Sequence, residues 1–297
     1  MSSPTPRPPG SAISLQHPLV CMLMEIARHY DEEREDEPPD DADQWLADHP
    51  AAGRELLLAV LADESLRYEG SPGEGWLPLL AAGFLADTRD PAVVTPMLEL
   101  LIRLDVGDEL AEALWDALYR MGPVIVEPTF AFVAAAPDEP LRRAVATAIL
   151  GETGSKDERI FELLVDELSN NPIIASGQLC EFGDQRALPH LLRELDARSV
   201  IDPDDGHQPG DTFNEIAAAI VDLGGELSEV QLAKWERAQR LLRDSRDWGD
   251  MPEPAFYKLA RMAPRSSQAV TFTRFVMTSA DAPDDERAMT ISPRAKG

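Results

Sequence analysis

Apolar residues recur every three or four positions between residues 75 and 245, with polar residues between them. Leu188, Leu191 and Leu195 are one such series. This spacing puts the apolar side chains on one face of an α-helix, whereas a half-buried strand would require strict alternation. The helical segments group into five pairs, at 75–104, 107–136, 138–169, 172–197 and 211–244. Because one pair cannot bury its apolar stripe alone, we expect the pairs to stack along a shared core.

Each pair is expected to reverse direction at a glycine. Gly122, Gly154 and Gly183 follow one another at intervals of 32 and 29 residues, and Gly224 continues the series after an insertion. Glycine suits the left-handed residue just past a helix end because it lacks a Cβ. Counting back one unit puts Asp90 at the equivalent position. A repeat of this length is typical of a solenoid.

Further residues keep a fixed distance from these corners. An apolar residue stands four positions before each glycine, and a proline or isoleucine stands six positions after three of them. The earlier residues are Leu118, Leu150, Leu179 and Ile220, and the later ones are Pro128, Ile160 and Pro189. Proline at that distance fits the first turn of a second helix. Capping boxes would start three helices, with the pairs Ser155 and Glu158, Thr212 and Glu215, and Ser228 and Gln231.

The pattern predicts an all-α protein, an α-α superhelix, with four regions along the chain. Residues 1–13 are rich in proline and serine and are expected to be disordered. Residues 14–74 would form an atypical N-terminal helical cap that contains an acidic loop at 31–43. Helices within this cap are expected at about 14–31, 44–47 and 51–61. Residues 75–245 would form the stacked pairs, and residues 246–297 a partly disordered C-terminal extension.

Charge and composition narrow the classes of partner. The chain has 27 basic and 54 acidic residues, a net charge of −27. Such a surface repels phosphate backbones and anionic membranes, so neither nucleic acid nor a membrane is an expected partner. A basic protein is favoured by electrostatic steering, although an acidic surface can equally serve solubility alone. The excess of arginine over lysine, together with abundant alanine, proline and glycine, is typical of a GC-rich bacterial genome.

Cysteine usage and hydropathy indicate a cellular location. Cys21 and Cys180 lie in apolar helical stretches without metal-ligand spacing. We expect both to be buried, small hydrophobic side chains in a reducing compartment. The chain has no run of 18 apolar residues, and its first residues do not form a secretory signal. These features predict a cytoplasmic protein.

Three segments resemble a family of bacterial repeat proteins. They are LGETGSKDERIFELLVDEL, CEFGDQRALPHLLREL and RMGPVIVEPTF. Over about residues 75–245 the chain is similar to the HEAT-like repeats of the phycobilisome-lyase type. The resemblance implies a right-handed α-α superhelix that is used mainly as a protein-binding scaffold. It does not fix a function, because related repeats also serve lyases, hydroxylases and glycosylases.

Residues suited to catalysis or metal binding are sparse. No histidine is followed by the glutamate that di-iron hydroxylases on HEAT-type repeats require. One polar loop gathers possible ligands of a hard cation, namely Asp202, Asp204, Asp205 and His207. That loop lacks the residue order of an EF-hand, and a solvated turn is the simpler interpretation. His190 is expected to be half-buried or on the surface rather than catalytic. Without a nucleophile elbow, phosphate loop or Cys-His pair, we predict no catalytic residue and no cofactor.

We therefore expect a non-enzymatic adaptor that binds a basic protein on an acidic α-solenoid surface. An inhibitor or immunity protein for a nucleic-acid-binding toxin is one version, because an acidic surface can occupy a basic groove. The alternative is an enzyme or an enzyme accessory on the same fold, such as a lyase subunit. Pigment or metal bound to the purified protein would favour the alternative.

Overall fold

The computed structural model describes residues 13–31, 41–68, 70–105, 107–201 and 210–245. Over these ranges the protein is helical and has no strand, which confirms the predicted all-α class. The N-terminal helices are α1 (Pro18–Asp31), α2 (Asp41–Asp48) and α3 (Pro50–Ala62), and the short 3₁₀ helix η1 (Glu64–Leu66) follows them. All three α-helices lie close to the predicted positions. Both α1 and α3 begin at a proline, whose missing N–H costs no hydrogen bond in a first turn.

Five helix pairs follow, close to the predicted limits of each pair. The first helices are α4 (Trp76–Thr88), α6 (Glu109–Met121), α8 (Pro140–Leu150), α10 (Pro172–Phe182) and α12 (Asp211–Asp222). The second helices are α5 (Val94–Leu101), α7 (Val126–Ala135), α9 (Glu158–Glu167), α11 (Leu188–Ala197) and α13 (Glu229–Ser245). Short 3₁₀ turns lie between the helices of four pairs, namely η2 (Pro91–Val93), η3 (Gly122–Ile125), η4 (Gly151–Thr153) and η5 (Gln185–Ala187).

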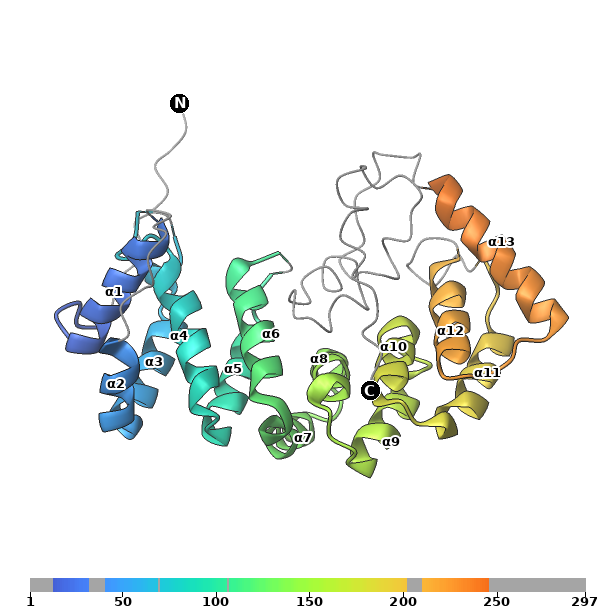
Figure 1. Cartoon of the computed structure of the whole chain (residues 1–297), viewed down its shortest axis with the longest axis horizontal. Helices are drawn as coiled ribbons and strands as arrows, with labels where there is room; N and C mark the ends of the chain where they lie inside the picture. Colours follow the sequence, from blue (N-terminus) through green and yellow to red (C-terminus); the bar gives the residue numbers. More distant parts are fainter. Residues whose placement is uncertain (1–12, 32–40, 69, 106, 202–209, 246–297) are drawn as a thin grey trace, which may run out of the picture.

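The helices stand side by side in the order of the chain and trace an arc (Figure 1). Each first helix packs against the first helix of the next pair, most extensively α4 against α6 and α10 against α12. In Figure 1, α8 and α10 lie on the side toward which the arc opens, whereas α7 and α9 lie on the opposite side. Contacts are therefore mainly between neighbours in the chain, as expected for stacked helix pairs.

The chain reverses at the predicted glycines. Positive φ angles between +65° and +81° are found at Gly122, Gly154, Gly183 and Gly224. In the first pair the left-handed residue is Arg89, with φ +49°, and not Asp90, which was placed at this position. The Asp90 carboxylate instead accepts the backbone N–H of Ala92 at 2.9 Å and starts η2. The corner of the first pair is thus displaced by one residue from the predicted register.

Aspartates start the helical segments after two other corners. The carboxylate of Asp157 accepts the backbone N–H of Arg159 at 2.9 Å, so Asp157 is the N-cap of α9. The predicted capping box at Ser155 is therefore wrong. Asp184 accepts the N–H of Arg186 in the same way, also at 2.9 Å. A side-chain acceptor at this point satisfies one of the unpaired N–H groups of the first turn.

One predicted capping box is confirmed, at the start of α13. The backbone N–H of Gln231 donates to Ser228 Oγ at 3.3 Å, and the N–H of Ser228 donates to Gln231 Oε1 at 2.9 Å. The box predicted at Thr212 is wrong, because α12 begins directly after Gly210 and Thr212 already lies within it. The buried Thr212 hydroxyl has no hydrogen-bond partner among the described residues.

Two hydrophobic clusters fill the array. The first extends from α1 to α8 and the second from α7 to α13. Helix α8 belongs to both, because Val145 and Ile149 pack in the first cluster and Ala146 and Leu150 in the second. Residues four apart share one face of a helix, so α8 presents a different face to each cluster. The four apolar residues that precede the corner glycines are fully buried, namely Leu118, Leu150, Leu179 and Ile220.

Some predictions concern residues outside the described ranges. They are the disorder of residues 1–12, the larger part of the acidic loop, at 32–40, and the C-terminal extension, at 246–297. For the helices that the structure does describe, none combines the length and the hydropathy needed to cross a bilayer.

Candidate functional site

Arg186 joins two successive units close to their corners. Its Nη1 and Nη2 donate to the two carboxylate oxygens of Glu158, at 2.8 and 2.9 Å. The same guanidinium donates from Nε to Asp184 at 2.8 Å and lies 4.6 Å from the ring centre of Phe161. Hydrogen bonds from Arg186 hold the pKa of both Glu158 and Asp184 below its ordinary value. These carboxylates are therefore already compensated within the protein.

The same arrangement occurs one unit earlier, around Arg159. Arg159 Nη1 donates to Glu127 at 3.2 Å, and Nη2 donates to Asp157 at 2.6 Å. The guanidinium lies 4.7 Å from the ring centre of Phe130. Here too, hydrogen bonds from the arginine lower the pKa of the two carboxyl groups. Two successive interfaces thus contain the same side-chain contacts at equivalent positions of the repeat.

A second set of carboxylates has no arginine partner. Each of its members stands two residues before a corner glycine. We call this set the carboxylate row, and it consists of Glu152, Glu181 and Asp222. Within the described part of the chain none of the three forms an ion pair, although thirteen contacts of that kind are found elsewhere. Because equivalent positions in stacked units project from the same face, we expect these groups to lie on one side of the array.

Burial raises the pKa of each carboxyl group in the row. The nearby charge of Glu181 raises the pKa of Glu152 further, against a hydrogen bond from Gln178 that lowers it. Near Asp222, on α12, burial raises the pKa of Glu215 to about 7, and the charges of two neighbouring aspartates add to this shift. The row is therefore a place where negative charge is costly and where no cation of the described residues forms an ion pair.

The equivalent positions in the N-terminal half are neutralised. Asp87 stands two residues before Arg89, and Arg120 stands two residues before Gly122. Arg120 Nη1 lies 3.1 Å from Asp87, and its Nε lies 3.0 Å from Asp116. The arginine at this register position supplies the cation that the later units lack. At this register position, carboxylates without an ion pair among the described residues are thus found in the later units.

The two cysteines differ from each other and partly from the prediction. Cys180 is half-buried beside the carboxylate row, and burial raises the pKa of its thiol to about 11, with the charges of Asp222 and Glu181 adding to the effect. A thiol with this pKa is a poor nucleophile at neutral pH. Cys21 was predicted to be buried but is exposed, because it lies off the face through which α1 enters the core. Its Sγ donates to the carbonyl of Leu15 at 3.4 Å.

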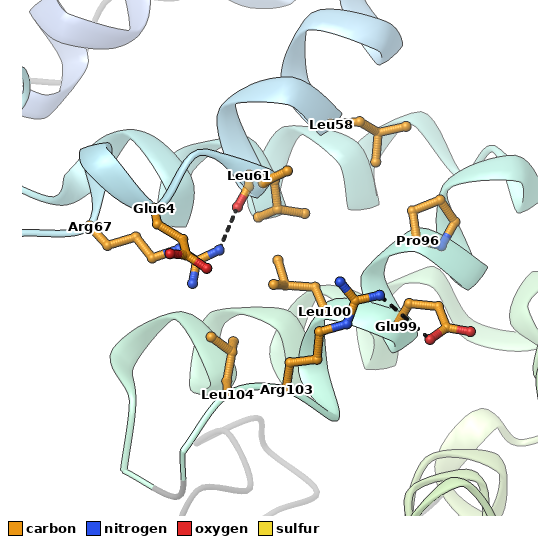
Figure 2. A pocket seen from close by; sticks show the side chains of 10 residues that line it. Leu58, Leu61, Glu64, Arg67, Pro96, Glu99, Leu100, Arg103 and Leu104 are labelled. Atoms are coloured by element: carbon orange, nitrogen blue, oxygen red, sulfur yellow. Dashed lines mark hydrogen bonds and ion pairs between the residues drawn. The ribbon is translucent and has the colours of Figure 1, made fainter. Parts of the chain in front are cut away.

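A pocket of about 320 Å³ lies between α3 and α5 in the first half of the array (Figure 2). Its walls combine apolar and charged side chains, and they are Leu58, Leu61, Ala62, Glu64, Arg67, Pro96, Glu99, Leu100, Arg103 and Leu104. Figure 2 shows the guanidinium groups of Arg67 and Arg103 among leucine side chains. The pocket is far from the carboxylate row and differs from it in the sign of the available charge.

The candidate metal ligands Asp202, Asp204, Asp205 and His207 lie outside the described residues. A hollow of about 440 Å³ between residues 197–201 and α13 has a basic wall that includes Arg198, Lys234 and Arg237. In the described ranges no three His, Cys, Asp or Glu side chains are grouped so that they could hold a metal ion. His190 is half-buried on α11, with its ring edge-on to Phe161 at 6.4 Å.

Comparison with known proteins found no relative of this chain. No family model matches it, and searches of curated proteins and of solved structures found no match. The candidate site therefore stands on the geometry and electrostatics of the described residues.

Sequence reasoning did not single out the carboxylate row, although the signal was present. An acid two residues before Gly154, Gly183 and Gly224 is visible in the chain once the corners are aligned. What the alignment could not show is which acids are paired. Arg159 and Arg186 each have one partner about one repeat away in sequence, Glu127 and Glu158, and only the packing of one unit on the next brings these pairs together.

Proposed function

We propose that this protein is a non-enzymatic scaffold built as a HEAT-like α-α superhelix, which binds a basic protein along the carboxylate row. The superhelix is supported by the contacts of Arg159 and Arg186, which repeat from one unit to the next. Stacked helical repeats reproduce their interfaces in this way because each unit contacts only its neighbours. The expected setting is the cytoplasm of a bacterium, on the composition and cysteine usage of the chain.

One observation carries the binding site: three acids, of which Glu152 is half-buried and Glu181 and Asp222 are exposed, occupy the same register position in successive units, and none of them forms an ion pair with another described residue. A lysine or arginine from a partner would meet carboxylates that are not ion-paired with any described residue, and it would lower their pKa again. Two small residues precede members of the row in sequence. Ala148 lies one turn before Glu152, and Gly177 lies one turn before Glu181. Small side chains would let a partner segment approach closely.

The net charge of −27 would steer a basic partner toward this face before contact. Electrostatic steering and ion pairing both weaken as salt rises, because the Debye length falls to about 8 Å at physiological ionic strength. A protein with a basic groove for nucleic acid is one partner of the required chemistry. The scaffold would then act as an inhibitor or an immunity protein.

The test uses a short oligoarginine peptide as a defined basic probe, with binding followed by fluorescence anisotropy. A triple variant, Glu152→Gln, Glu181→Gln and Asp222→Asn, removes the three charges of the row. A matched variant, Glu162→Gln, Asp166→Asn and Glu236→Gln, removes the same charge from exposed positions on α9 and α13. We expect the peptide to bind wild type and the matched variant at low salt, and the row variant at least about tenfold more weakly.

Equal loss in the two triple variants would show that overall charge, rather than the row, attracts the peptide. Binding that does not weaken between low salt and about 0.15 M salt would contradict the electrostatic mechanism. Crosslinking in the native host, followed by mass spectrometry, then identifies the natural partner. Crosslinks should concentrate on α8, α10 and α12.

A further inference from the structure

The pocket between α3 and α5 has the dimensions and walls of a small-molecule site. Its volume of about 320 Å³ lies at the lower end of the range of about 300 to 1,000 Å³ that is usual for ligand pockets. Most of its lining is aliphatic, with Leu58 and Leu61 from α3, Leu100 from α5 and Leu104 just beyond it. An aliphatic chain placed there would leave water and contact leucine side chains on both sides.

Arg67 brings an unsatisfied donor to this pocket. Its Nη2 reaches the carbonyl oxygen of Leu61 at 3.4 Å, which is a long hydrogen bond. Its Nε is buried and has no hydrogen-bond partner among the described residues. A buried donor without an acceptor costs free energy, and the cost is larger for a charged group. The Arg67 guanidinium can thus donate a further hydrogen bond to an acceptor atom of a ligand in the pocket.

The glutamates in the lining do not supply that acceptor. Glu99 Oε1 accepts from Arg142 Nη2 at 2.7 Å, so this carboxylate is mainly bound to a residue outside the pocket. Arg103 approaches only Glu99 Oε2, at 3.8 Å, and its own side chain is 71% exposed. Glu64 is exposed, and no ion pair joins it to Arg67 in the part of the chain described. Two guanidinium groups therefore remain available beside an aliphatic wall.

We propose that this pocket binds a small aliphatic monocarboxylate, with its carboxylate between Arg67 and Arg103 and its chain against the leucines. The planar guanidinium group can donate two parallel hydrogen bonds to the two oxygens of a carboxylate. For Arg67, one of these donors is the Nε–H that has no other partner among the described residues. A phosphate dianion is disfavoured because the net charge of −27 opposes each added negative charge. A monoanion with an apolar chain uses both features of the site, the donors and the aliphatic surface.

Octanoate is the probe, and isothermal titration calorimetry measures its binding to the full-length protein. Octanol has the same chain without the charge, octylamine reverses the charge, and octyl phosphate tests the dianion. We expect one octanoate per chain and at least about tenfold weaker binding of the other three probes. A short peptide that ends in Leu-Leu with a free C-terminal carboxylate distinguishes a protein terminus from a free acid as the source of the carboxylate.

Two substitutions test the arginines. Arg103→Gln changes an exposed side chain, so folding should be unaffected, and Arg67→Lys keeps the charge but removes the Nε–H. Each should weaken octanoate binding by roughly tenfold or more, since hydrogen bonds to charged groups contribute about 1.5 to 3 kcal/mol. Arg193→Gln, at an exposed position on α11, is the matched control and should bind octanoate like wild type.

Three outcomes would overturn the proposal. If octanol binds as tightly as octanoate, the arginines do not contribute to binding and the pocket is only an apolar cavity. Equal binding by the Arg103 and Arg193 variants would place the anion elsewhere. If the Leu-Leu peptide binds more tightly than octanoate, the ligand of the pocket is a peptide C-terminus and not a free acid. None of these outcomes affects the carboxylate row, which lies on other helices.

Discussion

At the scale of the residue, Glu215 shows how the cost of negative charge near the row should affect stability. Burial raises its pKa from 4.5 to about 7, with the charges of Asp211 and Asp222 adding to the shift. The folded protein therefore keeps this proton at a pH at which the unfolded chain has lost it. Stability from this group is fully present below about pH 4.5 and is lost as the pH rises to about 7.

Glu215→Gln should remove this pH dependence, because the amide does not ionise. We expect the variant to be more stable than wild type at about pH 8, by an order of 2–3 kcal/mol at most, since one pKa unit corresponds to about 1.4 kcal/mol. The difference should shrink toward zero near pH 4.5. Urea unfolding across the pH range measures it. Glu162→Gln, at an exposed position on α9, should follow wild type, and a constant offset of the Glu215 variant would contradict the assignment.

Gly151 illustrates a glycine required by space rather than by conformation. It has right-handed φ and ψ, yet a Cβ built on it would lie 1.9 Å from Gln178 Oε1 and 2.6 Å from Gln178 Cβ. Gly151→Ala should destabilise the protein by about 2 kcal/mol through overpacking. Adding Gln178→Ala should recover part of this loss in thermal unfolding.

At Gly154 there is open space around a Cβ built on the backbone, so nothing would clash with an alanine side chain. Gly154→Ala should therefore cost only the strain of a left-handed backbone conformation, about 1 kcal/mol.

At the scale of the element, the ion pair between Arg143 of α8 and Glu167 of α9 differs from the exposed arginine contacts at the corners. Glu167 is 1% exposed, and its carboxylate accepts from Arg143 Nε at 2.5 Å and from Asn171 at 2.6 Å. Arg143→Met would leave a buried carboxylate with only the amide as partner. We expect a loss of about 2–3 kcal/mol in unfolding free energy. Adding Glu167→Gln should restore most of it, and simple additivity of the two changes would contradict this interpretation.

The sequence predicted the elements well, and it predicted less of how they begin. The five pairs and four corner glycines follow from apolar spacing and from the need for a left-handed residue, both of which are local properties. Two of three capping boxes were wrong, because spacing does not show which nearby acceptor takes the first N–H. The N-cap of α9 is Asp157, and not the predicted Ser155. The pairing of Arg142 with Glu99 joins α8 to α5 across 43 residues, and no local rule reveals it.

At the scale of the whole molecule, the carboxylate row and the pocket lie in different halves of the array. The row belongs to η4, which follows α8, and to α10 and α12, whereas the pocket lies between α3 and α5. The two hydrophobic clusters divide the protein in a similar way and meet at α7 and α8, each of which has buried residues in both clusters. We therefore expect the two halves to be coupled mainly through α7 and α8, because stacked units interact with their neighbours.

Leu150→Ala should therefore uncouple the halves. Leu150 is fully buried in the second cluster, one residue beyond Ile149 of the first, and leucine-to-alanine changes in a core cost about 2–5 kcal/mol. We expect urea unfolding to split into two transitions with smaller slopes, because each half then exposes its own surface separately. Leu57→Ala, a fully buried change in α3, should lower the stability of the first half and leave hydrogen exchange in α10 and α12 unchanged. A single, merely shifted transition for Leu150→Ala would mean that contacts other than those of α8 hold the array together.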